Sequence, residues 1–140
     1  MPKPQSLTLL AQAESLGSVT HFVRESAREA KLPASLLGEL DLLVEEIFMN
    51  ITRHAYPKGL PGPVSVTCLV TGPGELAVEF SDQGIEFNPL KVDPPNLALN
   101  LEQRPAGGLG VFLLKAFADS LSYRREQGSN RLTFVISSKP

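Results

Sequence analysis

The hydrophobic pattern changes from helical to strand-like after Pro63, and this change decides which fold classes remain open. Before Pro63, apolar residues recur at the three- and four-residue spacing of amphipathic helices. After it, short apolar runs alternate with turn residues, as is typical of hairpins. The expected helices are residues 15–31, residues 33–55 and, behind a glycine-rich turn, residues 107–118. The expected strands are residues 6–10, 64–70, 75–80, 121–126 and 131–137.

This order of elements predicts an α+β fold. Strands that follow one another as hairpins favour a mixed, mainly antiparallel sheet, and the two long helices have apolar faces to bury against it. We therefore expect a two-layer sandwich with helices packed on one face of the sheet. The 140 residues suit a single domain, residues 1–140, and a hydrophobic fraction of 42% can supply its core.

Charge and cysteine content narrow the function classes. The net charge is −2 and no lysine or arginine cluster stands out, so we expect no direct binding to nucleic acid. The single Cys68 lies in an apolar run and predicts a buried, inert thiol. No long apolar stretch follows Met1, so we expect no signal peptide, no membrane span and a cytoplasmic protein.

Polar residues follow one stripe of the second expected helix. Glu46, Asn50 and His54 are four residues apart, so all three project from the same side. A carboxylate there can serve as a base, and a carboxamide oxygen is a hard ligand that suits Mg²⁺. A solvated helix face would show the same spacing.

Two glycine-containing turns complete the candidate chemistry. In Asp82-Gln83-Gly84, at the end of a strand, the carboxylate could accept a hydrogen bond from an exocyclic amine such as that of adenine. In Gly107-Gly108-Leu109-Gly110, at a helix start, uncovered backbone N–H groups and the helix dipole suit a phosphate. A simple turn at the first site and a hinge at the second remain open as alternatives.

The order and spacing of these features resemble the Bergerat ATP-binding fold, and in detail its small anti-sigma factor serine/threonine kinases. Similar stretches are Glu46-Ile47-Phe48-Met49-Asn50 with His54-Ala55-Tyr56, Asp82-Gln83-Gly84 with Phe87-Asn88-Pro89, residues 104–113, and residues 128–133. The resemblance spans nearly the whole chain.

The resemblance implies a role for each matching residue. Glu46 would be the general base and Asn50 the Mg²⁺ ligand. Asp82 would bind the amino group of adenine, with Gly84 beneath the ring. Thr133, on a late strand, would lie near the adenine.

The resemblance also implies how the phosphates of ATP would be held. Residues 89–106 would form a lid over the nucleotide, and we expect this segment to be mobile without ATP. Arg53 and His54 would line the site. Phosphate-binding backbone amides are implied at Gly107, Gly108, Leu109, Gly110 and Val111.

The implied function is phosphorylation of a serine or threonine on a STAS-domain anti-sigma antagonist, with ATP and Mg²⁺ as cofactors. A sigma factor would be the second partner, and the small kinases of this family act as homodimers. The chain departs from the family pattern Asp-x-Gly-x-Gly, because Glu86 stands at the second glycine. Two alternatives therefore stay open: an ATP-binding partner switch without phosphate transfer, and a kinase of a circuit outside sigma control.

Overall fold

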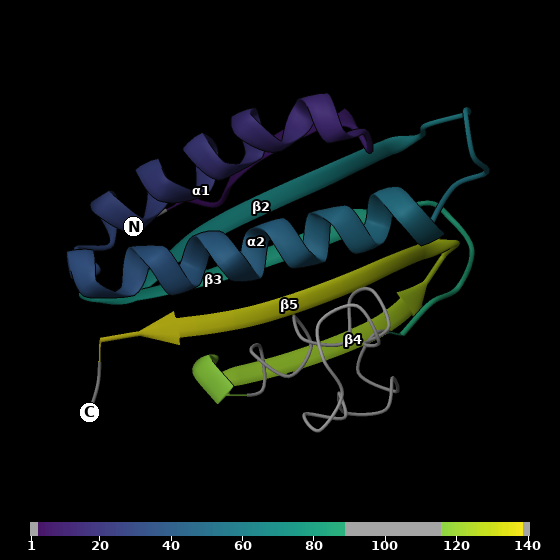
Figure 1. Cartoon of the computed structure of the whole chain (residues 1–140). Helices are drawn as coiled ribbons and strands as arrows, with labels where there is room; N and C mark the ends of the chain where they lie inside the picture. The colour runs from purple at the N-terminus through teal and green to yellow at the C-terminus, as the bar shows by residue number, and fades with distance from the viewer. Residues whose placement is uncertain (1–2, 89–115, 139–140) are drawn as a thin grey trace, which may run out of the picture.

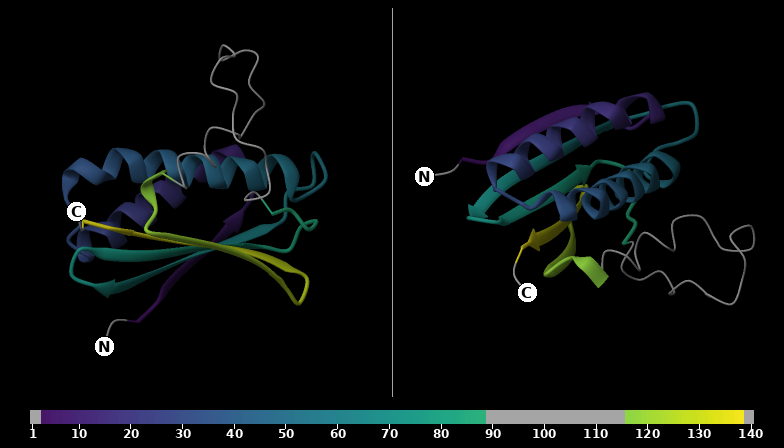
Figure 2. Two further views of the ribbon diagram at one scale, coloured as in Figure 1. Left: turned by 90° about the horizontal axis from the view of Figure 1, so that it is seen from below. Right: turned by 60° about the vertical axis from the view of Figure 1, so that its left-hand side comes forward.

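The computed structural model describes residues 3–88 and 116–138, which form two layers (Figure 1). Two helices lie side by side on one face of a five-stranded sheet, as further views confirm (Figure 2). The predicted α+β sandwich is therefore confirmed. All described strand pairs are antiparallel, so in this part of the chain the sheet is not mixed as expected.

The elements follow the predicted order, with limits shifted by a few residues at most. They are β1 (Gln5–Leu10), the 3-10 turn η1 (Ala13–Ser15), α1 (Leu16–Glu29), α2 (Ala34–His54), β2 (Pro63–Gly72), β3 (Glu75–Asp82), β4 (Ser120–Glu126) and β5 (Ser129–Ser137). The strand order in the sheet is β1-β2-β3-β5-β4, so β5 lies between two strands that precede it in sequence. The helix expected at residues 107–118 falls mostly outside the described residues.

Backbone conformation at the turns explains where the elements stop. After α1, Lys31 has a φ of 62°, and its N–H donates to Arg28 while Leu32 N–H donates to Ala27. This pattern is a Schellman motif, which satisfies the last carbonyl groups of a helix. Between β4 and β5, Gln127 and Gly128 have φ values of 51° and 79°, as in the type I′ turns that match the twist of a hairpin.

The core lies between the helices and the inner face of the sheet. Phe48 of α2, Phe80 of β3 and Phe134 of β5 are fully buried there. Cys68 of β2 is also buried, and burial raises the pKa of its thiol to about 11. The thiol is therefore protonated at neutral pH, in agreement with the inert cysteine that the sequence predicts.

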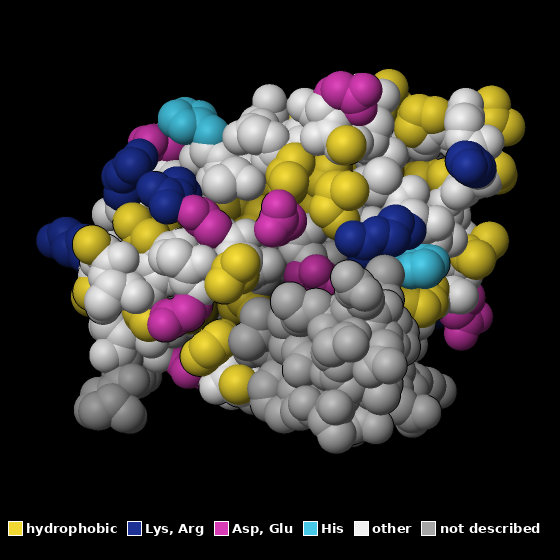
Figure 3. Space-filling model, viewed as in Figure 1, with side chains coloured by type: hydrophobic (Ala, Val, Ile, Leu, Met, Phe, Trp, Pro, Cys, Tyr) yellow, Lys and Arg dark blue, Asp and Glu magenta, His cyan; other side chains and the backbone are white. Residues whose placement is uncertain are grey.

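The outward face of the helical layer carries charges of both signs. Acidic and basic side chains are interspersed there with hydrophobic ones, and no broad basic patch is seen among the described residues on this face (Figure 3). Neither of the described helices combines the length and the apolar character needed to cross a membrane.

Candidate functional site

The C-terminal half of α2 presents the predicted polar stripe at the edge of the core. Asn50 is buried, and its Oδ1 accepts a hydrogen bond of 3.1 Å from the guanidinium of Arg53. One turn earlier lies Glu46, whose Oε1 is buried and has no hydrogen-bond partner among the described residues. A buried carboxylate oxygen without a partner is costly, and such a group is a candidate for a functional role. The neighbouring Glu45 is exposed.

Asp82 and Asn130 form a buried polar pair opposite this stripe. They are register partners at the adjacent ends of β3 and β5, and each is 5% exposed. Asp82 Oδ1 accepts from Asn130 Nδ2 and from Gly84 N–H, both at 2.9 Å. Among the described residues, Oδ2 of Asp82 accepts no hydrogen bond, so this oxygen remains available to a ligand that donates one.

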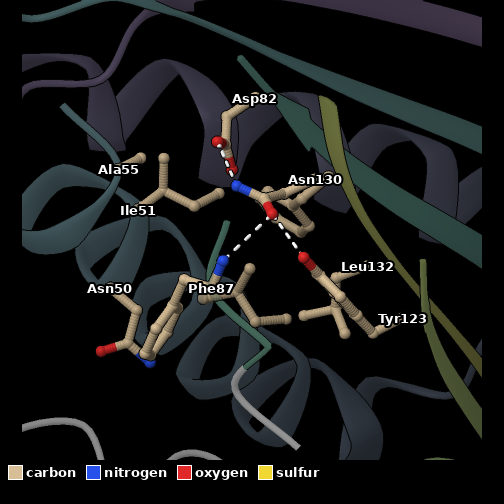
Figure 4. Close-up of a pocket in the computed structure, with 10 residues that line it drawn as sticks. Asn50, Ile51, Ala55, Asp82, Phe87, Tyr123, Asn130 and Leu132 are labelled. Atoms are coloured by element: carbon tan, nitrogen blue, oxygen red, sulfur yellow. Dashed lines mark hydrogen bonds between the residues drawn. The ribbon is translucent and has the colours of Figure 1, made fainter. Parts of the chain in front are cut away.

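The Asn130 carboxamide makes three further hydrogen bonds, of which those to Phe87 and Tyr123 are drawn in Figure 4. Its Nδ2 donates to the carbonyl oxygen of Ile85 at 2.7 Å, and its Oδ1 accepts from Phe87 N–H at 3.2 Å and from the Tyr123 hydroxyl at 2.5 Å. Burial and the charge of Glu86 both raise the pKa of Tyr123, so its hydroxyl remains a donor.

These residues surround a pocket between α2 and the sheet. Its lining is mainly apolar, with polar groups at Asn50, Asp82, Tyr123 and Asn130; the apolar residues are Ile47, Ile51, Ala55, Phe80, Phe87 and Leu132. This mixture of apolar walls and a few convergent polar groups is typical of small-molecule sites. The free volume is about 30 Å³, room for about one or two water molecules, so a purine base requires the pocket to widen.

Gly84 belongs to the support behind the pocket. Its carbonyl oxygen accepts from Arg125 at 2.8 Å, and the next residue, Ile85, donates its N–H to Ala55 O at the end of α2 at 2.9 Å. A Cβ atom on Gly84 would lie 2.1 Å from that same Ala55 oxygen. A glycine is therefore required where this turn touches the helix.

The second glycine of the family pattern is not required for the backbone seen here. Among the described non-glycine residues, only Lys31 and Gln127 have positive φ, so Glu86 adopts its conformation without left-handed strain. Its side chain is exposed.

Most of the predicted site residues in the described part of the chain come together. Asn50 and Asp82 line the pocket, and Arg53 lies beside it through its bond to Asn50. His54 packs its ring against that of Phe87, with centroids 5.1 Å apart. The expected lid at residues 89–106 and the expected phosphate-binding residues Gly107, Gly108, Leu109, Gly110 and Val111 lie outside the described residues.

The structure corrects the expected location of Thr133. Side chains of β5 alternate between the two faces of the sheet, and Asn130 and Leu132 take the inner face. Thr133 therefore lies on the outer face, opposite Glu79, to which its hydroxyl donates at 3.4 Å. Asn130 and Tyr123 are the polar pocket residues that the sequence did not identify. The alternation along β5 could have pointed to Asn130, because its side chain lies on the same face as those of Leu132 and Phe134.

The described residues hold no cluster of three His, Cys, Asp or Glu side chains that could bind a metal ion. The stripe offers oxygen ligands at the carboxamide of Asn50 and, one turn earlier, at the carboxylate of Glu46. Mg²⁺ is usually held by one or two protein ligands together with substrate phosphates and water. The residues present therefore fit Mg²⁺ that arrives with a nucleotide.

Comparison with known proteins agrees with this geometry. Residues 9–136 match the family of histidine kinase-like ATPase domains. The serine/threonine-protein kinase BtrW of Bordetella bronchiseptica is 30% identical over 138 residues, which cover 99% of this chain and 96% of that protein. The serine-protein kinase RsbW of Bacillus thuringiensis is 26% identical over 94 residues, 66% of this chain and 59% of that protein.

A solved structure has the same fold. The crystal structure of the RsbU and RsbW domains of Rv1364c from Mycobacterium tuberculosis aligns with 99% of this chain and 33% of its own, with a TM-score of 0.67 and 18% sequence identity.

Proposed function

The chain belongs to the family of histidine kinase-like ATPase domains, and we propose that it is an ATP-dependent protein serine/threonine kinase that acts as an anti-sigma factor. Its substrate in this proposal is a STAS-domain anti-sigma antagonist. The observation that carries the proposal is the pocket that joins Asn50 of α2 to Asp82 of β3. The similarity to BtrW over nearly the full length of both chains supports kinase activity rather than nucleotide binding alone.

The base would bind at the inner end of the pocket. Asp82 holds its Oδ1 against two protein N–H donors, so its Oδ2 faces the ligand as a hydrogen-bond acceptor. An adenine amino group supplies the matching donor. The apolar walls contributed by Ile51, Phe80 and Leu132 would bury the two faces of the ring.

The phosphate end would lie along the polar stripe of α2. Asn50 would hold Mg²⁺ through Oδ1 after Arg53 has left that oxygen, and the guanidinium would then be free to pair with phosphate. Mg²⁺ supplies charge neutralisation at the phosphate oxygens. Glu46 lies about 6 Å further along the helix axis, at a rise of about 1.5 Å per residue. Its buried, unpartnered oxygen suits a base that accepts the proton of a serine or threonine hydroxyl.

The partners in this proposal rest on the family and on its relatives. We propose that the kinase forms a homodimer, which sedimentation would test, and that it exchanges the STAS-domain protein for a sigma factor. Kinase activity in a circuit outside sigma control differs only in the identity of the partner.

Phosphate transfer from γ-labelled ATP to a STAS-domain protein tests the proposal. Glu46→Gln keeps the shape and removes the charge, so transfer should fall by a factor of about 10²–10⁴ while ADP affinity changes little. Glu45→Gln is the matched control, because its side chain is exposed on the same turn, and it should transfer at the wild-type rate. A wild type that binds ATP and its partner but never transfers phosphate would instead be a non-catalytic partner switch.

A further inference from the structure

The Asn130 side chain connects two walls of the pocket that come from distant parts of the chain. Its Nδ2 bonds to Asp82 at 2.9 Å and to Ile85 at 2.7 Å, and its Oδ1 bonds to Phe87 and Tyr123. A carboxamide has two donor hydrogens and one acceptor oxygen with two lone pairs. All four sites are filled, so the group is held in a single orientation.

The two ends of the carboxamide serve different parts of the pocket. The nitrogen end holds the carboxylate that would recognise the edge of the base. The oxygen end holds the backbone of Phe87, whose side chain forms a wall of the same pocket (Figure 4). We infer that Asn130 is a positioning residue that fixes Asp82, which would bind the edge of the base, relative to the wall formed by Phe87. Selectivity for 6-aminopurines over 6-oxopurines then depends on Asn130. The inference rests on the proposed function.

The selectivity follows from the orientation of Asp82. With Oδ1 filled by Asn130 and Gly84, the oxygen left for a ligand can only accept a hydrogen bond. A 6-amino group donates to it, whereas a 6-oxo group presents a second acceptor. Sites that leave buried polar groups unpaired reject a ligand strongly. If Asn130 no longer donated, the carboxylate could turn its free oxygen away from the 6-amino group. The affinity for a 6-aminopurine would then fall, while a 6-oxopurine has no such bond to lose.

Asn130→Asp separates the two ends of the side chain. The acceptor oxygen that faces Phe87 and Tyr123 is kept, while the donor to Asp82 and Ile85 becomes a second acceptor. Two carboxylates so close share a proton at low pH, and the shared proton restores a donor. Among the described residues, the other charged or titratable groups around this position are Tyr123, Glu86 and Arg125 on the side of β4 and the turn after β3. On the side of α2 they are Arg53, bonded to Asn50, and His54, packed against Phe87.

The experiment measures, by calorimetry, the ratio of the affinities for ADP and inosine diphosphate. Their bases differ in the group at position 6 and in N1, which carries a hydrogen only in the 6-oxopurine. The wild type should prefer ADP at every pH between 6 and 8. In Asn130→Asp the ratio should fall by about tenfold or more at pH 8, the range expected for a hydrogen bond to a charged group. It should recover as the pH is lowered to 6. Because both ligands carry the same phosphates, their titration cancels in the ratio.

Thr133→Val is the matched control, since Thr133 lies on the same strand but on the outer face of the sheet, where its hydroxyl bonds to Glu79. It should keep the wild-type ratio. Thermal melting of each variant shows whether it is folded, and Asn130→Leu, which has a similar size and no donor, replaces Asn130→Asp if the latter does not fold. An unchanged ratio in a folded Asn130 variant, or a lowered ratio without pH-dependent recovery in Asn130→Asp, overturns the inference. A wild type that binds neither ligand overturns the proposed function itself.

Discussion

Replacing Gly84 by alanine should destabilise the protein far more than the addition of one methyl group usually does. The added Cβ would meet Ala55 at 2.1 Å from its oxygen, 2.5 Å from its carbonyl carbon and 2.6 Å from its Cβ. The oxygen and the carbonyl carbon belong to the backbone at the end of α2, so no rotamer change relieves the clash. The turn after β3 has to move away from the helix, which breaks the bond from Ile85 N–H to Ala55 O.

The expected cost combines two effects. Forcing an extra methyl group into a packed site costs about 1–3 kcal/mol, and a lost backbone hydrogen bond adds about 0.5–1.5 kcal/mol. We therefore expect the free energy of unfolding of Gly84→Ala to fall by about 2–4 kcal/mol, measured by urea titration. ADP affinity should fall as well, because Gly84 N–H also holds Asp82 in place.

Gly38→Ala is the matched control within the same protein. Gly38 lies inside α2, is exposed, and has no neighbouring atom within 4 Å of an added Cβ. The same chemical change there should raise the free energy of unfolding by about 0.5–1 kcal/mol, because alanine favours a helix interior. The free energy of unfolding of Gly84→Ala could instead lie within about 0.5 kcal/mol of the wild-type value, the usual effect of a surface change. That result would refute the close approach of the turn to α2.

Two further predictions test the outer face of the sheet and the core. Thr133→Val should leave ADP affinity, measured by calorimetry, within about threefold of the wild-type value, a change under about 1 kcal/mol. The reason is that the Thr133 hydroxyl points away from the pocket. A loss beyond about tenfold, or about 1.4 kcal/mol, would show that Thr133 does belong to the site. Burial raises the pKa of Cys68 to about 11, above its value of about 8.5 in an unfolded chain. At pH values below the pKa of the unfolded chain, the protonated thiol therefore contributes stability. This contribution is lost as the pH rises toward 11. The free energy of unfolding should fall more in the wild type than in Cys68→Ala between pH 8 and pH 10.5, which is about two pH units above the unfolded pKa. Equal slopes of the free energy of unfolding against pH in the two proteins would contradict this.

The fold was predictable because each element carries its own local signal. The helices show apolar spacing, and both hairpins contain glycine at their turns. Asp82 and Asn50 were predictable because they stand at recognisable places, the end of a strand and a helix stripe. Asn130 was not identified, since an asparagine beside Gly128 in a hairpin looks like turn chemistry. Only strand pairing brings it opposite Asp82, a residue 48 positions earlier.

The extent of β3 also exceeded the prediction. The sequence suggested a strand that stops at Phe80, but Asp82 pairs with Val64 on one side and Asn130 on the other. Polar residues at a strand end give no apolar signal, so the last register pairs cannot be read from the hydrophobic pattern. Those pairs place Asp82 rigidly in the sheet rather than on a flexible turn.

The position of β5 in the sheet has a consequence for synthesis. The segments that become α2, β2 and β3 leave the ribosome before residue 130, so Asp82 at first lacks the partner that β5 supplies along one edge of β3. A slip of one residue in the pairing of β5 would turn Asn130 outward and set Arg131 against Asp82. The pocket therefore forms only in a chain whose late hairpin has been inserted in the correct register. Under the proposed function, a chain in which β5 is not yet paired, or is paired out of register, would not bind adenine through Asp82.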